Sequence, residues 1–190
     1  MTASRPAALA ALLVLSAATA AQAQSGLIAG GCPAGQTFTA GGISVTGAYL
    51  RATPPAAQSA GAYLVIHNAG PAADTFTGAS TSAAGDTALH QMSMNGQVMQ
   101  MSDVPGGLPV PAGGSVSLDP MGYHLMLTGL SAPFVEGQCL GMVLHFAKAG
   151  DLNIELNIGS ITQNGPPAAT PGVSIMPSSQ PAMPSMSMPM

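Results

Sequence analysis

The sequence predicts an all-β protein with one sandwich- or barrel-like domain. Gly and Pro are plentiful, at 24 and 17 of 190 residues, and no long segment shows the apolar repeat of a helix. Short segments of alternating or apolar residues recur between turn signals at regular spacing. That spacing is typical of a β-sandwich or barrel rather than of a parallel sheet whose strands alternate with helices.

The first 23 residues have the layout of an export signal. Arg5 supplies the positive charge, the apolar run AALAALLVLSAATA follows, and the AQA at 21–23 offers a cleavage site. The run is short and alanine-rich, and no later segment is long and apolar enough to cross a bilayer. We therefore expect cleavage near Ala23 and a soluble exported protein with no membrane span. A lipid anchor at Cys32 is disfavoured, because Ala29 stands where a lipobox needs a large aliphatic residue.

Residues 24–41 are expected to form an N-terminal extension, and residues 42–162 the β domain. Nine strands are expected in it, separated by turns rich in Gly, Pro and Asn. The expected strands are 43–50, 61–67, 74–79, 87–94, 97–101, 115–118, 123–128, 140–146 and 152–158.

Charge excludes several partner classes. Only 5% of the residues are charged, and after loss of Arg5 the basic residues are Arg51 and Lys148 against seven carboxylates. Nucleic-acid binding needs clustered basic residues to neutralise phosphates, and an anionic membrane surface attracts basic segments. Neither is an expected partner.

The two cysteines, Cys32 and Cys139, are far apart in sequence. In an oxidising compartment they can form a disulfide, and closing so long a loop stabilises a fold by ~4–5 kcal/mol in the chain-entropy model. The alternative is that a thiol binds metal. A disulfide is favoured, because no closely spaced cysteine pair is present.

The chemistry is concentrated between His90 and Met126. This stretch holds two of the four histidines and six of the thirteen methionines. Imidazole nitrogen and thioether sulfur form a soft, neutral donor set, which suits Cu(I) better than Ca²⁺, Mg²⁺ or structural Zn²⁺. The pattern predicts a copper site.

Turn chemistry predicts how the first half of this site is arranged. Asn95-Gly96 is a strong signal for a two-residue hairpin turn, and that turn sets His90 opposite Met101 with Cβ atoms roughly 5 Å apart. Side chains alternate along a strand. The residues expected on one face of the hairpin are His90, Met92, Met94, Gln97, Met99 and Met101.

The second half of the expected site lies within one strand. His124 and Met126 point to the same face, whereas Leu125 points the other way, into the core. A His/Met pair on each of two segments can form a four-coordinate cage.

The alternative is that the methionine face is ordinary core. Methionine fills gaps in cores, and the alternate hairpin residues Gln91, Ser93 and Gln100 are polar. Burying His90 and His124 without hydrogen-bond partners would cost free energy. Binding of a metal ion satisfies one ring nitrogen on each histidine, which favours the metal site.

The arrangement resembles the periplasmic copper chaperones of the PCuAC type. That family has a His, ten residues, a Met, about twenty-one residues and then His-x-Met. Here ten residues separate His90 from Met101, and twenty-two separate Met101 from His124-Leu125-Met126. The surrounding AYLRATPP, GAYLVIHNAG and PAGGSVSLDPMGYHLML are similar too, so the resemblance covers about residues 42–160.

The resemblance implies a cupredoxin-like Greek-key β-sandwich or barrel in the periplasm. It also implies Cu(I) held by His90, Met101, His124 and Met126. The expected client is the binuclear copper centre of cytochrome c oxidase subunit II, or another periplasmic copper carrier.

Residues 163–190 are expected to be a disordered Met/Pro-rich tail, with Met176, Met183, Met186, Met188 and Met190 as further thioethers. They are either low-complexity sequence or a tether that captures or passes on Cu(I).

No ordered Ser, His and Asp set or phosphate loop indicates an enzyme, and no cysteine beside the His/Met cluster indicates a blue-copper carrier. The two remaining histidines, His67 and His145, are expected at the surface. The predicted function is therefore a metallochaperone. The alternatives are an exported β-sandwich adhesion or scaffolding module without metal, and a copper storage or resistance protein that uses the tail.

Overall fold

The computed structural model describes residues 26–28, 30–33 and 35–166, and the prediction of an all-β fold is confirmed there. No helix in this part of the chain has the length and apolarity that a membrane crossing requires. The strands are β1 (Leu27–Ile28), β2 (Thr37–Ala40), β3 (Ile43–Arg51), β4 (Ser59–Asn68), β5 (Asp74–Ser80), β6 (Ala84–Asn95), β7 (Val98–Asp103), β8 (Leu108–Val110), β9 (Ser115–Leu118), β10 (Tyr123–Leu130), β11 (Cys139–Phe146) and β12 (Gly150–Gly159).

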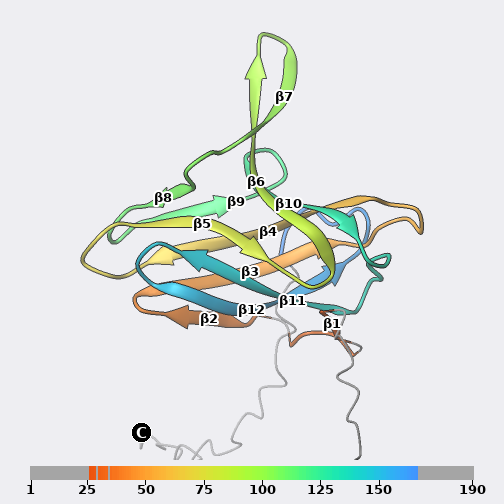
Figure 1. Ribbon diagram of the computed structural model, residues 1–190, viewed down its shortest axis with the longest axis horizontal. Helices are drawn as coiled ribbons and strands as arrows, with labels where there is room; N and C mark the ends of the chain where they lie inside the picture. Colours follow the sequence, from red (N-terminus) through yellow and green to blue (C-terminus); the bar gives the residue numbers. More distant parts are fainter. Residues whose placement is uncertain (1–25, 29, 34, 167–190) are drawn as a thin grey trace, which may run out of the picture.

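All nine expected strands are present within a few residues of their expected bounds. The sequence analysis missed β1, β2 and β8, which are short. The hydrogen-bonded order is β7-β6-β10-β9-β4-β3-β12-β11-β5-β8, with β10 also paired to β4, β2 to β3 and β1 to β11. The sheet folds over on itself and encloses one core, to which β3, β4 and β10 as well as β5, β11 and β12 contribute buried residues (Figure 1).

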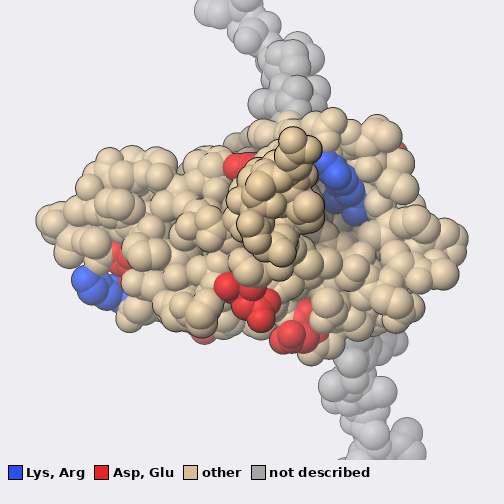
Figure 2. Space-filling model, turned by 90° about the horizontal axis from the view of Figure 1, so that it is seen from above, with Lys and Arg blue, Asp and Glu red and all other residues tan. Residues whose placement is uncertain are grey.

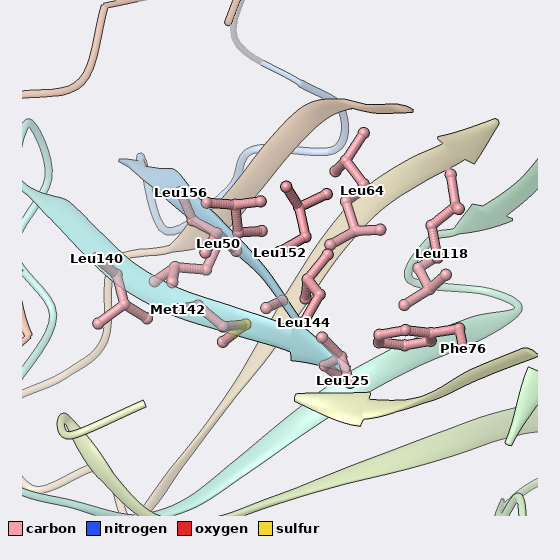
Figure 3. Packing of buried hydrophobic residues seen from close by; sticks show 14 of the residues in the cluster. Leu50, Leu64, Phe76, Leu118, Leu125, Leu140, Met142, Leu144, Leu152 and Leu156 are labelled. Carbon is pink, nitrogen blue, oxygen red and sulfur yellow. The ribbon is translucent and has the colours of Figure 1, made fainter. Parts of the chain in front are cut away.

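The core consists of the inward-facing residues of both layers. Leu64 and Leu125 come from one side, whereas Phe76, Leu144 and Leu156 come from the other, and each is 1% exposed or less. Figure 3 shows these side chains meeting between the strands. As predicted, Leu125 points into this core.

A β-bulge in β3 decides which side chains face away from the core. The register between β3 and β4 shifts by one residue between Thr46 and Tyr49, and Gly47 there has φ of +62°. A positive φ is readily adopted by glycine. The extra residue reverses the alternation, so that Val45 and Leu50 both face the core while Tyr49 faces outward.

The β6–β7 hairpin projects from the body of the sandwich (Figure 1). Its turn lies at Gly96-Gln97, because Asn95 pairs with Val98. The expected turn at Asn95-Gly96 is therefore wrong. Gly96 has φ of +64° and Gln97 has no positive φ, which fits a type II′ turn.

The register of the hairpin consequently differs by two residues from the expected one. Met94 pairs with Met99, and Met92 pairs with Met101. His90 lies opposite Asp103 rather than opposite Met101. A shift of two residues keeps each side chain on its original face, so the expected methionine face survives, while Gln97 moves into the turn.

The predicted disulfide between Cys32 and Cys139 is confirmed, with Cα atoms 5.3 Å apart. Beside it, β1 pairs with β11, and β2 pairs with β3. The segment before β3 is therefore joined to the sheet covalently and by backbone hydrogen bonds.

Candidate metal centre

The candidate site begins with two histidines on neighbouring strands. His90 of β6 lies directly opposite His124 of β10 on the face of the sheet that points away from the core. Their ring centroids are 5.8 Å apart, and the rings meet edge to face. The sequence could not predict this contact, because it depends on how two distant strands pair.

Hydrogen bonds leave one ring nitrogen of His90 free to bind metal. Its Nε2 lies 2.9 Å from Oδ1 of Asp103. In the neutral imidazole Nε2–H donates to this carboxylate, so Nδ1 keeps its lone pair. Nδ1 is buried and has no hydrogen-bond partner among the described residues. A carboxylate behind a ligating histidine is the usual arrangement at metal sites.

His124 is oriented through its other nitrogen. Nδ1 lies 3.3 Å from the carbonyl oxygen of Gly122. Donation of Nδ1–H to that oxygen leaves Nε2 as the available donor. Burial lowers the pKa of His124, and the neighbouring His90 lowers it further, against the opposing effects of Gly122 and Asp119. His124 is therefore held neutral, which is the form that binds a metal ion.

The two methionines of the candidate set differ in position. Met126 is half-buried, follows His124 by two residues on the same face, and has Ala88 and Gly61 as its cross-strand neighbours. Neither neighbour carries a side chain longer than a methyl group. Met101 is 48% exposed and lies on the hairpin, two residues along β7 from the Asp103 that opposes His90. His90, His124 and Met126 are thus adjacent, and Met101 lies one cross-strand pair further out.

Two tyrosines that the sequence analysis did not assign to the site continue the line of outward-facing side chains beside His124. Tyr63 of β4 packs beside His124 with ring centroids 6.5 Å apart, and Tyr49 of β3 packs on Tyr63 at 5.1 Å. A Cβ atom at Gly61 would lie 2.5 Å from the hydroxyl oxygen of Tyr63, so only glycine lets this ring lie over the strand. Arg51 lies over the same ring at 5.8 Å.

The segment that follows β12 contacts Arg51 beside these two tyrosines. The Arg51 guanidinium donates hydrogen bonds to the Gln163 carbonyl and, at 2.7 Å, to the Asn164 side chain. Tyr49 and Tyr63 are almost completely buried although they point away from the core. Burial raises the pKa of both phenols, against the lowering effect of Arg51, so they remain neutral.

The expected surface positions of His67 and His145 are confirmed. His67 bonds through Nδ1 to Ser115 Oγ at 2.8 Å. His145 bonds through Nε2 to Ser80 and through Nδ1 to Asp151, at 2.9 and 2.7 Å. A Ser–His–Asp set is therefore present, contrary to the expectation from sequence. Asp151 is 68% exposed, and the set joins the three adjacent strands β5, β11 and β12 at their solvent face.

One group of three His, Cys, Asp or Glu donors lies close enough to share an ion in the described part of the chain: Cys32, Cys139 and Glu155. Both of its sulfurs are in the disulfide, so it offers no thiolate. A separate cavity of about 530 Å³, lined by residues including Ser80, Met142 and Glu155, contains none of the four candidate ligands. The expected signal peptide and tail methionines lie outside the described residues.

Comparisons with known proteins agree with this fold. The model of the LpqE-like family, described as "Putative lipoprotein LpqE-like", matches residues 43–158. A curated relative from Leifsonia xyli subsp. xyli, "Putative lipoprotein Lxx21020", is 32% identical over 108 residues. That match spans 57% of this chain and 64% of the relative's length.

Two solved structures are similar over about two thirds of the chain. A copper-bound PCuAC domain from PmoF2 is 22% identical, with a TM-score of 0.57, over 66% of this chain and 98% of that one. The solution structure of CuI-DR1885 from Deinococcus radiodurans is 27% identical, with a TM-score of 0.51, over 67% of this chain and 83% of that one.

Fold and comparisons define a cupredoxin-like β-sandwich domain with the fold of PCuAC domains, bearing a His/Met cluster on one outer face. The chain belongs to the LpqE-like family.

Proposed function

We propose that this protein is a Cu(I) metallochaperone whose ligands are His90, Met101, His124 and Met126. The observation that carries the proposal is the histidine pair. Two imidazoles face each other across adjacent strands, and each has one ring nitrogen held by Asp103 or by the Gly122 carbonyl. The nitrogens left over, Nδ1 of His90 and Nε2 of His124, are the available donors.

The donor set suits Cu(I) as cargo. Thioether sulfur is a soft ligand, and it needs no deprotonation to bind. Met126 lies beside His124, and Met101 can reach inward from the next cross-strand pair of the hairpin. The likeness to CuI-DR1885, a structure named for its copper(I), supports copper as the ion.

The exposure of the ligands suits transfer rather than permanent retention. His124 is 6% exposed and anchors the buried side of the cluster, whereas Met101 is 48% exposed and reachable by another protein. A ligand of an acceptor protein can replace Met101 first, while the histidines still hold the ion. The proposed site is thus buried at His124 and open to solvent at Met101.

We propose that the protein works in the periplasm after loss of residues 1–23. The description of its relative as a putative lipoprotein supports export. Because Cys32 is bonded to Cys139 in the disulfide, its sulfur is not available to carry a lipid through a thioether bond. The proposed copper acceptor is the binuclear centre of cytochrome c oxidase subunit II, or another periplasmic copper carrier.

The test is an anaerobic Cu(I) titration of the mature protein against a chromophoric chelator. His124→Ala/Met126→Ala should remove one tight equivalent. Met121→Ala is the matched control, because Met121 is 68% exposed and outside the proposed ligand set, so its loss should leave that equivalent intact. Unchanged tight binding in the double variant would contradict the proposal. Several equally tight equivalents, lost only on deletion of residues 167–190, would instead indicate a storage protein.

A further inference from the structure

The proposed site uses one of the four methionines on the projecting hairpin and leaves three unexplained. Met94 opposes Met99, and Met92 opposes Met101, so the four thioethers form two cross-strand pairs on one face. Met94, Met99 and Met101 are 62, 41 and 48% exposed, and Met92 is half-buried. We call these four residues the methionine ladder.

Among the residues that the structure describes, no element packs over the exposed thioethers of the ladder. A core methionine such as Met142 is 3% exposed, whereas both faces of the outer hairpin are open to water. The opposite face carries mostly polar residues, among them Ser93 and Gln100, and no residue from 91 to 102 is charged. Figure 2, which looks at the hairpin end on, shows it as an uncharged projection above the sheet.

The geometry of the ladder fits a soft monovalent ion. Directly opposed Cβ atoms in an antiparallel pair are about 5 Å apart, and the flexible methionine side chain brings its sulfur well beyond Cβ. Met94 and Met99 can therefore bind one ion between them, with Met92 of the next pair as a third thioether. Successive pairs on one face are separated by about 7 Å, twice the rise per strand residue.

We propose that the tip of the hairpin is a second Cu(I) site, formed by Met94 and Met99 with Met92, through which copper enters and leaves the His/Met site. This proposal rests on the proposed function. The ion stays Cu(I) throughout, since transfer is a ligand exchange in which a bond to a tip sulfur breaks as a bond to Met101 or His90 forms. The tip set lacks imidazole and is open to water, so it binds more weakly and the ion moves inward.

The first test follows the methionine methyl groups by NMR in the full-length protein carrying ¹³C-methyl methionine. Met94→Leu and Met99→Leu assign the two tip signals. Cu(I) is added anaerobically as its acetonitrile complex, up to three equivalents. We expect the Met101 and Met126 signals to shift with the first equivalent, and the Met94 and Met99 signals to shift with later additions.

The variant His124→Ala/Met126→Ala separates the two proposals. In it, the Met94 and Met99 signals should still respond to Cu(I). Tip signals that never shift would overturn the second site, as would shifts that vanish with the histidine site. Failure of the Met101 and Met126 signals to shift in the wild type would instead overturn the proposed function, whatever the tip does.

A kinetic measurement tests the role of the tip in exchange. Met94→Leu/Met99→Leu should slow removal of the tightly bound Cu(I) by a chromophoric chelator several-fold, and leave its equilibrium affinity unchanged. Val98→Leu is the control, because Val98 is 63% exposed on the opposite face of the same hairpin. Equal removal rates in the wild type and the double variant would overturn the exchange role.

Discussion

The sandwich body and the β6–β7 hairpin use the same residue type in opposite ways. In the body, Met142 is 3% exposed and packs among leucines of the core, whereas Met94 at the hairpin tip is 62% exposed. The body is cross-linked by a disulfide and supplies a rigid base for His124. The difference shows that a methionine count alone cannot separate core from site. The exposure of Met94 excludes a core role, because a side chain surrounded by water contributes little to packing.

The largest expected effect is on the body alone. Cys32→Ser/Cys139→Ser should lower the free energy of unfolding by roughly 4–5 kcal/mol, because the disulfide closes a loop with a sequence separation of 107. Urea unfolding under oxidising conditions measures the loss. Tight Cu(I) binding should persist wherever the variant remains folded. Loss of copper from the folded variant would mean that hairpin and body are coupled more closely than their contacts indicate.

A matched pair of truncations compares the two regions directly. Leu144→Ala in the core should cost about 3 kcal/mol in the free energy of unfolding, because it leaves a cavity among fully buried side chains. Met99→Ala on the hairpin should cost less than about 0.5 kcal/mol, since that side chain is 41% exposed. Chemical denaturation of both variants checks this difference. Comparable losses of unfolding free energy in the two variants would show that Met99 is packed like a core residue, and would contradict the difference between hairpin and body.

The acid stability of the body depends on Asp74. Its buried carboxylate accepts backbone N–H bonds from Thr75, Lys148 and Ala149, at 2.7, 2.9 and 2.9 Å. Burial raises the pKa of Asp74, but these bonds and the Lys148 charge outweigh it, so the pKa lies below its usual value. A depressed pKa stabilises the fold above the unfolded-state value of about 3.9, and this stabilisation is lost as pH falls through the folded pKa.

Asp74→Asn should therefore lower the free energy of unfolding by about 2 kcal/mol at neutral pH, since the amide cannot replace both carboxylate oxygens as acceptors. The gap in the free energy of unfolding between wild type and variant should shrink below about pH 4, because the wild-type carboxylate becomes protonated there. Urea unfolding at a series of pH values measures both. A gap that stays constant down to about pH 2 would contradict this role of the carboxylate.

A smaller loss is expected where hairpin and body meet. Asp103→Asn should weaken Cu(I) binding roughly tenfold, because the amide orients the His90 imidazole less strongly than the carboxylate does. Asp86→Asn is the control, since it removes a carboxylate from the same strand as His90 without touching the ring. Chelator competition measures both variants. Equal affinities would show that His90 is positioned by its strand alone.

Much of the candidate site could be predicted from local sequence. The donor types, the strand that carries His124 and Met126, and the presence of a hairpin beyond His90 follow from side-chain chemistry and turn signals. The hairpin register did not follow, because Asn95-Gly96 and Gly96-Gln97 both place glycine where positive φ is tolerated. Only the structure shows that Asp103 lies opposite His90.

By itself the sequence determined the nine longer strands, the disulfide partners and the soft donor set, since each depends on residue type and short-range periodicity. The tertiary structure decided the contact between His90 and His124, the outward turn of Tyr49 at the Gly47 bulge, and the exposure of the methionine ladder. These features depend on which distant strands pair and in which register. The pairing is set by burial of the whole core, which no single segment encodes.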